Sequence, residues 1–173
     1  TWLSSVSTQE YMKFQPGRCG YTHFLDHEGN IIDDMIFAVS NEAEVLGVPN
    51  STMVTTVMGW LSSNLPQDGS VVIEDLSDQT SIIALQGPNS GKILRDTLGE
   101  ENDVQRFRCQ EIMANGLELS GWIQGTGYTG EKGVEIFIQN EDSRRLWDAL
   151  LSHPDSAPVG LGARDTLRLE KGY

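Results

Sequence analysis

The amino-acid sequence predicts an α+β protein with mostly antiparallel sheets packed against helices. Strand-like segments with period-two alternation follow one another across short polar loops, as they do in hairpins. A few other segments have the 3.6-residue apolar period of helices, and they are interspersed with the strands. With 173 residues, of which 38% are hydrophobic, the chain is long enough for one sizeable core or two small ones.

The first predicted element is a β-hairpin. Residues 19–26 and 31–40 read as its two strands, because apolar and polar side chains alternate in both. The loop between them, HEGN at 27–30, is polar and contains glycine, as hairpin loops often do. A short third strand is expected at 44–50.

A helix is predicted over 51–65, with Ser51 or Thr52 as its N-cap. Its apolar face consists of Val54, Val57, Met58 and Leu61. After this helix, residues 70–77 and 80–87 both read as strands.

Two further helices are predicted in the second half of the chain. The first covers 88–99, with a proline near its first turn and a glycine at its end. The second covers 141–153 and stops before Pro154. Its apolar residues are Leu146, Trp147, Leu150 and Leu151. A helix-like run also occupies 163–173.

The stretch GTGYTG, from Gly125 to Gly130, has the spacing of the G-x-G-x-x-G nucleotide-binding turn. That turn requires a helix directly after the glycines, because free N–H groups of the helix hold the phosphates. Here the following segment, 134–138, alternates with period two and is rich in β-branched and aromatic residues. The glycines are therefore expected to join two strands, the first of which is 117–124.

Charge and composition exclude several classes of function. The net charge is −13 and no run of Lys or Arg interrupts it, which argues against nucleic-acid binding and against an anionic membrane patch. No apolar run is long enough to cross a bilayer. Cys19 and Cys109 lie too far apart for a C-x-x-C pair, and the three histidines lack the spacing of metal ligands. No metal site is expected, and the protein is predicted to be intracellular.

Three charged residues are candidates for a functional role, each with a structural alternative. Asp33 and Asp34 lie inside an apolar strand, so one of them should face the covered side of the sheet, unless they simply finish the hairpin at a sheet edge. Glu135 shares a strand face with Phe137, and a carboxylate beside an aromatic ring suits a flat heterocycle with an N–C–N edge. The alternative for Glu135 is an ordinary solvated face.

Arg164 lies just after two glycines, near an expected helix N-terminus. An arginine there could bind a carboxylate, helped by the free N–H groups of the helix. It could equally pair with Asp165 or Glu170.

Four segments together resemble the T-protein of the glycine cleavage system, the tetrahydrofolate-dependent aminomethyltransferase family. They are YTHFLDHEGNIIDDMI, SIIALQGPNSGKIL, GTGYTGEKGVEIFI and PVGLGARDTLRLEKGY. The resemblance implies the family's fold of three domains around a central folate channel. It implies that residues 1–173 form the folate-binding core, truncated at both ends, with parts of the first two domains and without the C-terminal barrel-like domain.

The resemblance also implies roles for individual residues. Asp34 would be the catalytic carboxylate beside the reactive nitrogens of tetrahydrofolate, and Glu135 would bind the aminopyrimidine edge of the pterin. The remaining folate-binding residues would be Tyr21, Val48, Asn50, Tyr128, Arg164 and Tyr173.

The implied reaction is transfer of a one-carbon unit from a lipoyl-bound aminomethyl group to tetrahydrofolate, with release of ammonia. The implied partner is a lipoylated carrier protein, the H-protein. The alternatives are a folate-dependent demethylase acting on an N-, O- or S-methyl donor, and a non-catalytic folate-binding protein of iron–sulfur assembly. The expected compartment is the cytoplasm, or the mitochondrial matrix in a eukaryote.

Overall fold

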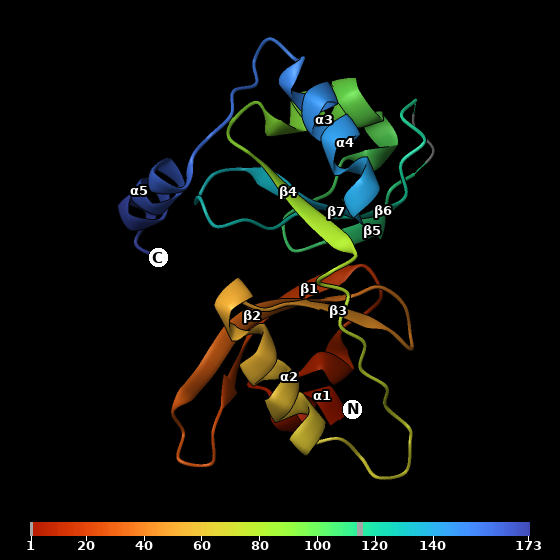
Figure 1. Cartoon of the computed structure of the whole chain (residues 1–173), viewed down its shortest axis with the longest axis vertical. Helices are drawn as coiled ribbons and strands as arrows, with labels where there is room; N and C mark the ends of the chain where they lie inside the picture. The colour runs from red at the N-terminus through yellow and green to blue at the C-terminus, as the bar shows by residue number, and fades with distance from the viewer. Residues whose placement is uncertain (1, 114–115) are drawn as a thin grey trace. The chain divides into compact units, whose positions relative to one another are not determined.

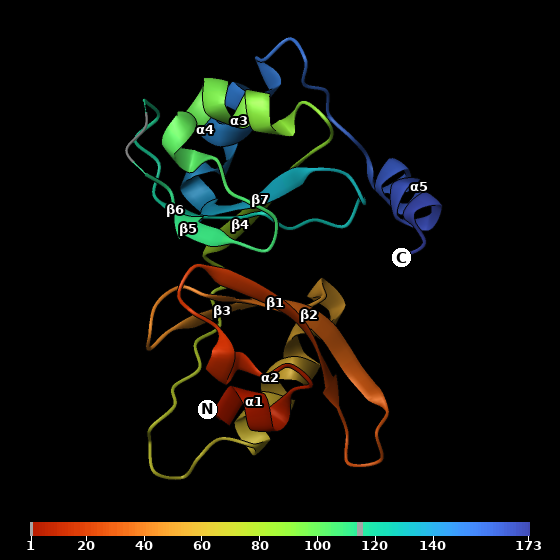
Figure 2. The same ribbon diagram turned by 180° about the vertical axis from the view of Figure 1, so that it is seen from behind.

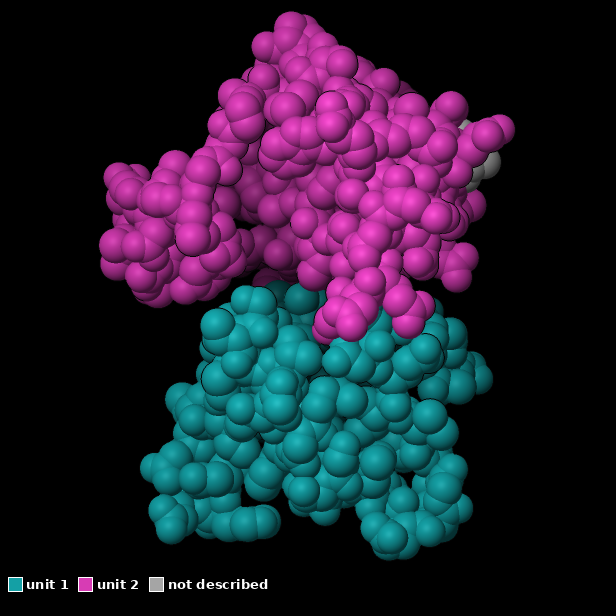
Figure 3. Space-filling model, in the orientation of Figure 1, with its two compact units in different colours: residues 1–76 teal, residues 77–173 magenta. Residues whose placement is uncertain are grey.

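The computed structural model describes residues 2–113 and 116–173. The chain divides into two compact units, residues 1–76 and residues 77–173, which Figure 3 shows in different colours. Each unit has its own sheet, its own helices and its own apolar core. The predicted α+β class with antiparallel sheets is confirmed.

Unit 1 is built on a three-stranded antiparallel sheet in the order β1-β2-β3. The strands are β1 (Arg18–Leu25), β2 (Ile31–Val39) and β3 (Val45–Val48), so the predicted hairpin and the short third strand are confirmed. Helices α1 (Trp2–Val6) and α2 (Val54–Ser63) lie on the same face of this sheet (Figures 1 and 2). A 3-10 helix, η1 (Tyr11–Lys13), was not predicted.

The core of unit 1 lies between the sheet and these helices. Alternate residues of β2 point into it, because successive side chains of a strand take opposite faces. The buried members are Leu3, Tyr11, Phe24, Met35, Phe37, Val39, Val57 and Leu61. The pKa of the Tyr11 phenol is raised, mainly by this burial. The next residues along β2, including Asp34 and Ile36, therefore take the sheet face opposite the core.

The start of α2 differs from its prediction. Residues Ser51–Met53 form a turn of 3-10 helix, η2, so the α-helix begins only at Val54 and neither Ser51 nor Thr52 is its N-cap. Met53 occupies that position without a side-chain hydrogen bond. Val57 and Leu61 are buried as expected, while Val54 and Met58 are half-buried.

The predicted strand at 70–77 is wrong. Residues 70–76 have no regular structure, and Val72 is 88% exposed. Apolar alternation alone does not make a strand, because each strand also needs a neighbour to pair its backbone groups. In the part of the chain that the structure describes, this segment belongs to neither sheet.

Unit 2 has a four-stranded antiparallel sheet in the order β4-β7-β6-β5. The strands are β4 (Thr80–Gln86), β5 (Cys109–Glu111), β6 (Gly121–Gln124) and β7 (Gly133–Gln139). The first and last of these strands follow their predictions closely. Strand β6 begins four residues later than predicted, and β5 was not predicted.

Helices α3 (Ser90–Leu98) and α4 (Ser143–Leu151) both cover one face of this sheet (Figures 1 and 2). Short 3-10 helices, η3 (Glu100–Asn102) and η4 (Asn140–Asp142), adjoin them. Gly99 ends α3 with φ +96°, a conformation that favours glycine, whereas Pro88 lies before the N-cap instead of inside the helix. The core consists of Ile83, Leu85, Ile93, Leu94, Leu98, Leu119, Ile123, Val134, Ile136, Ile138, Leu146 and Leu150.

The last two helices differ from their predictions in two details. Trp147 is 41% exposed, because Leu146 and Leu150 already occupy the stripe of α4 that faces the sheet. The last helix, α5 (Leu161–Lys171), starts earlier than predicted and has no buried residue. No helix among the described residues is both long and apolar enough to cross a membrane.

Candidate functional site

The predicted site residues divide evenly between the two units. Unit 1 contains Tyr21, Asp34, Val48 and Asn50, and unit 2 contains Tyr128, Glu135, Arg164 and Tyr173. In unit 1 the structure brings these residues together from separate elements, and in unit 2 it brings Tyr128, Arg164 and Tyr173 together.

In unit 1, Asp34 lies on the sheet face opposite the core and is half-buried. The Tyr21 hydroxyl donates a hydrogen bond of 2.7 Å to its Oδ2 atom. Strand register places His23 directly opposite Asp34, and the Tyr21 and His23 rings make an edge-to-face contact with centroids 5.0 Å apart. Asp34 is therefore held on β2 by a side chain from β1, well away from the hairpin turn.

The neighbouring carboxylate, Asp33, faces the other way. It is 5% exposed and takes the core face of the sheet. Asn50 satisfies both of its oxygens: the Asn50 side chain donates to Oδ1 at 2.7 Å and the Asn50 backbone N–H donates to Oδ2 at 3.1 Å. The same Asn50 amide donates to the Asp34 backbone carbonyl at 3.2 Å. Both aspartates therefore have specific partners within unit 1, which the alternative of two carboxylates at a sheet edge does not explain. Asn50, in the segment after β3, makes hydrogen bonds to both of them.

Val48 is the last residue of β3, directly before this segment. It pairs with Ile36 of β2 and is half-buried. Because Ile36 is two residues from Asp34 along the strand, Val48 and Asp34 share the sheet face opposite the core.

In unit 2, Glu135 lies on β7 between Gln124 of β6 and Ala84 of β4. It is half-buried on the face opposite the core, because its neighbours Val134 and Ile136 point into the core. The Thr126 hydroxyl, from the connection after β6, donates to its Oε2 atom at 2.5 Å. The alternative of an ordinary solvated glutamate does not describe this position.

Phe137 does not provide an open aromatic surface beside Glu135. Its ring is buried and stacks on Trp122 with centroids 4.6 Å apart and planes 4° from parallel. Among the predicted site residues of this unit, the exposed aromatic rings are Tyr128, 41% exposed, and Tyr173, 48% exposed.

The connection between β6 and β7 contains the six residues of GTGYTG, and a strand follows, so the structure contains no nucleotide-binding turn there. Tyr128 stacks on Tyr173 with centroids 5.9 Å apart, and the Arg164 guanidinium lies 4.7 Å from the centre of the Tyr128 ring. Gly130 has φ +73°, and a Cβ atom there would collide with the Lys171 side chain. Glycine at this position thus allows α5 to lie against the hairpin connection.

Arg164 is exposed in the first turns of α5 and makes neither of the two ion pairs considered for it. Asp165 pairs with Arg168 instead, through a 2.7 Å hydrogen bond that raises the pKa of the Arg168 guanidinium. The Arg164 guanidinium is therefore left beside the Tyr128 ring, where a carboxylate could reach it.

Several residues of this site were not predicted from the sequence. Thr126 and Gln124 flank Glu135, yet neither residue type stands out in a glycine-rich hairpin. The Asn50 contact with Asp33 spans 17 residues, so no local pattern indicates it. The one available signal was the pair of adjacent aspartates, of which one had to be buried and therefore needed hydrogen-bond donors.

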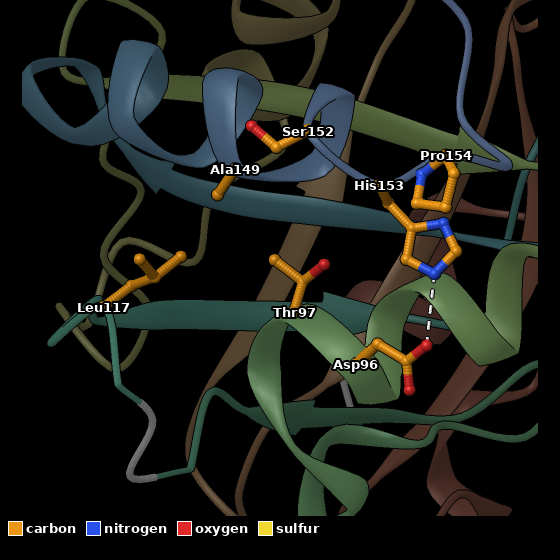
Figure 4. Close-up of a pocket in the computed structure, with 7 residues that line it drawn as sticks. All are labelled: Asp96, Thr97, Leu117, Ala149, Ser152, His153 and Pro154. Atoms are coloured by element: carbon orange, nitrogen blue, oxygen red, sulfur yellow. Dashed lines mark hydrogen bonds and ion pairs between the residues drawn. The ribbon is translucent and has the colours of Figure 1, made fainter.

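A groove of unit 2 lies away from these residues (Figure 4). It has a volume of about 380 Å³ and is lined by Asp96, Thr97, Leu117, Ala149, Ser152, His153 and Pro154. The His153 ring points across it to Asp96, with 3.1 Å between Nε2 and Oδ2. None of the predicted site residues lines this groove. Residues 2–113 and 116–173 contain no cluster of metal-ligating side chains.

Comparisons with known proteins agree with this architecture. The chain is 37% identical to an aminomethyltransferase of Chlorobium limicola over 177 residues, which cover 99% of this chain and 48% of the relative. It is 35% identical to an aminomethyltransferase of Geobacillus kaustophilus, over 98% of this chain and 47% of the relative. The chain thus spans about half the length of the curated relatives it matches.

A solved structure shares the fold. The crystal structure of glycine cleavage system aminomethyltransferase T from Bartonella henselae matches 99% of this chain and 45% of its own, with a TM-score of 0.85 and 27% identity. The family model described as the GCVT N-terminal domain matches residues 1–173. Because that match covers the whole sequence, the chain belongs to the GCVT N-terminal domain family.

Proposed function

We propose that the protein carrying this chain is a tetrahydrofolate-dependent aminomethyltransferase of the glycine cleavage system. In this reaction a one-carbon unit moves from an aminomethyl group on the lipoyl arm of a carrier protein to tetrahydrofolate, and ammonia is released. The proposal is supported by relatives named aminomethyltransferase and by the fold shared with a glycine cleavage aminomethyltransferase.

The observation that carries the proposal is the matching environment of two carboxylates. Asp34 and Glu135 both lie half-buried on the sheet faces opposite the cores of their units. A hydroxyl group orients each of them, from Tyr21 in one case and from Thr126 in the other. Carboxylates fixed in this way, with no ion pair to any other described residue, are suited to act on a bound molecule.

The side chains of unit 2 fit a folate. The Glu135 carboxylate can accept two parallel N–H bonds from the aminopyrimidine edge of a pterin. Tyr128 and Tyr173 offer exposed aromatic surface, and the Arg164 guanidinium beside them can pair with a carboxylate of the glutamyl tail. When bound, tetrahydrofolate would supply the nitrogen that accepts the one-carbon unit.

Asp34 is the residue that we assign to the chemistry. Its carboxylate can stabilise positive charge that develops on the nitrogen atoms of the reacting group, and it can hold a proton that one of them releases. The Tyr21 hydrogen bond fixes the side-chain orientation of Asp34, while Asn50 fixes the backbone beside it. Val48 and Asn50 would contribute main-chain contacts to the pterin.

The test is an assay of the full-length protein with tetrahydrofolate and alternative donors. We expect 5,10-methylenetetrahydrofolate to form from an aminomethyl-lipoyl carrier protein, with stoichiometric ammonia. Turnover of N-, O- or S-methyl compounds without activity on the carrier would instead identify a demethylase. Saturable folate binding without turnover of any donor would indicate a non-catalytic folate-binding protein.

A further inference from the structure

Gln86, the last residue of β4, holds the connection between β6 and β7 with its side-chain amide. Its Nε2 atom donates to the Thr126 carbonyl at 3.1 Å and to the Val134 carbonyl at 3.0 Å. Its Oε1 atom accepts a hydrogen bond of 3.0 Å from the Thr129 hydroxyl. One side chain therefore ties both ends of the connection and its middle to β4, although 40–48 residues of sequence separate these partners.

Two glycines leave the room that the Gln86 side chain occupies. A Cβ atom on Gly127 would collide with the Gln86 amide, to which its three nearest atoms would all belong. A Cβ atom on Gly133 would collide with the same amide and with the Leu85 carbonyl. Neither glycine has the left-handed φ that would itself favour glycine. Gly127 of GTGYTG is therefore explained by the side chain packed against it, and not by its backbone conformation.

The contacts of Gln86 meet at the residues that we propose for folate recognition. Tyr128 lies between Thr126 and Thr129, and Gln86 holds both of these neighbours. Thr126 also donates its hydroxyl to Glu135 while its carbonyl accepts from Gln86. Both N–H groups of the Gln86 amide are thus used within the protein, so its part is to support the residues that face a ligand.

We propose that Gln86 is a positioning residue for folate recognition, which acts through the backbone of the connection. This role rests on the proposed function, because it assumes that Tyr128 and Glu135 bind folate. Without the Gln86 amide, the Thr126 and Val134 carbonyls lose a donor, and the Tyr128 ring is no longer fixed in place. Folate affinity then falls more than the rate of the chemical step, which we assign to Asp34.

The first experiment removes the amide at similar length with Gln86→Met. Calorimetry with the full-length protein measures the dissociation constant of tetrahydrofolate, and a transfer assay measures turnover at saturating tetrahydrofolate. Affinity should fall about tenfold, because several neutral hydrogen bonds are lost, and this loss should exceed the loss of turnover. Gln139→Met, the same change at an exposed position of β7, is the matched control and should alter neither quantity.

A double-mutant cycle with Tyr128 separates positioning from general support of the fold. If Gln86 acts mainly through the Tyr128 ring, adding Gln86→Met to Tyr128→Ala should weaken tetrahydrofolate binding less than about threefold further. A residue that only stabilises the sheet would instead cause the same tenfold loss in both backgrounds.

Gly127→Ala disturbs the Gln86 amide without removing it, so it also serves if the methionine variant does not fold. It should weaken tetrahydrofolate binding about tenfold in the otherwise unchanged protein. Gln86→Ala removes the atoms with which the new Cβ would collide. In that background Gly127→Ala should therefore cause no further loss of affinity.

The outcomes separate this inference from the proposed function. Normal tetrahydrofolate affinity in the Gln86→Met protein would overturn the positioning role, and so would a full tenfold loss in the Tyr128→Ala background. Failure of the unchanged protein to bind tetrahydrofolate would contradict the proposed function itself, and the role of Gln86 with it.

Discussion

The two sheets hold their outward carboxylates in different ways. In unit 1 the surroundings of Asp34 are largely satisfied: Tyr21 donates to it, and Asn50 donates to the buried Asp33 and to the Asp34 carbonyl. In unit 2 the surroundings of Glu135 contain polar groups that the described protein does not pair, above all the Gln124 amide nitrogen. A satisfied network fixes one carboxylate in place, whereas the other lies beside buried donors that no described group pairs. In the proposed function, the chemistry therefore belongs to Asp34 and the recognition of folate to Glu135.

The largest expected effect is on turnover at Asp34. Asp34→Asn keeps the size of the side chain and removes its charge, so it should lower turnover by at least about 100-fold and change folate affinity by less than about threefold. The measurements are steady-state transfer from an aminomethyl-lipoyl carrier and calorimetric folate binding. Asp148→Asn, at an exposed carboxylate of α4, is the matched control and should leave both unchanged. Equal losses of turnover and affinity would remove the contrast between the two carboxylates.

At Glu135 we expect the opposite pattern, with a larger effect on folate affinity than on turnover. Glu135→Gln still offers an oxygen to Thr126 but cannot accept two charge-assisted bonds from a pterin edge. Loss of about 1.5–3 kcal/mol of binding free energy corresponds to a folate affinity roughly 10- to 150-fold weaker. Turnover at saturating folate should fall far less. Glu131→Gln, at an exposed position before β7, should bind folate normally. A variant with normal affinity and slow turnover would reverse the assignment.

The next prediction tests whether the hydrogen bonds between the buried Asp33 and Asn50 stabilise unit 1. Asp33→Asn replaces one acceptor oxygen by an amide, which faces a donor of Asn50 and leaves it unpaired. The free energy of unfolding should decrease by about 1–3 kcal/mol, as measured by urea denaturation. If stability and turnover both stay unchanged, Asn50 does not hold the segment that contains Asp34.

The smallest effect is expected at the hairpin connection of unit 2. Gly130→Ala places a Cβ atom at φ +73° and against the Lys171 side chain, at a cost of roughly 1–2 kcal/mol. The displaced α5 should carry Tyr173 and Arg164 with it, so folate affinity should fall several-fold while turnover at saturation is kept. Gly69→Ala has a similar backbone angle and open space around it, and should not affect binding. If the Gly130→Ala and Gly69→Ala variants bind folate with equal affinity, α5 does not contribute to folate recognition.

Much of this fold was predictable because its strands pair locally. The hairpin of 19–26 and 31–40 and the strand at 134–138 follow from alternation and from the loops beside them. The strand at 70–77 failed because alternation does not reveal whether a pairing partner exists. For the site, sequence patterns singled out Asp33, Asp34, Glu135 and Arg164, and family resemblance supplied their roles. Thr126, Gln124 and the contact of Asn50 with Asp33 could not be predicted, because they depend on tertiary register.

Helix α5 has a thermodynamic consequence of its own. It buries no side chain, and an eleven-residue helix is marginal in water by itself. Its order in this chain therefore depends on contacts such as the stack of Tyr173 on Tyr128, the approach of Arg164 to the Tyr128 ring and the fit of Lys171 against Gly130. Local opening should cost far less free energy than unfolding of β7, so the amide hydrogens of Leu161–Lys171 should exchange with solvent first. A ligand that binds against Tyr128 would slow this exchange. The exchange rate of the α5 amide hydrogens would therefore report whether a ligand is bound there.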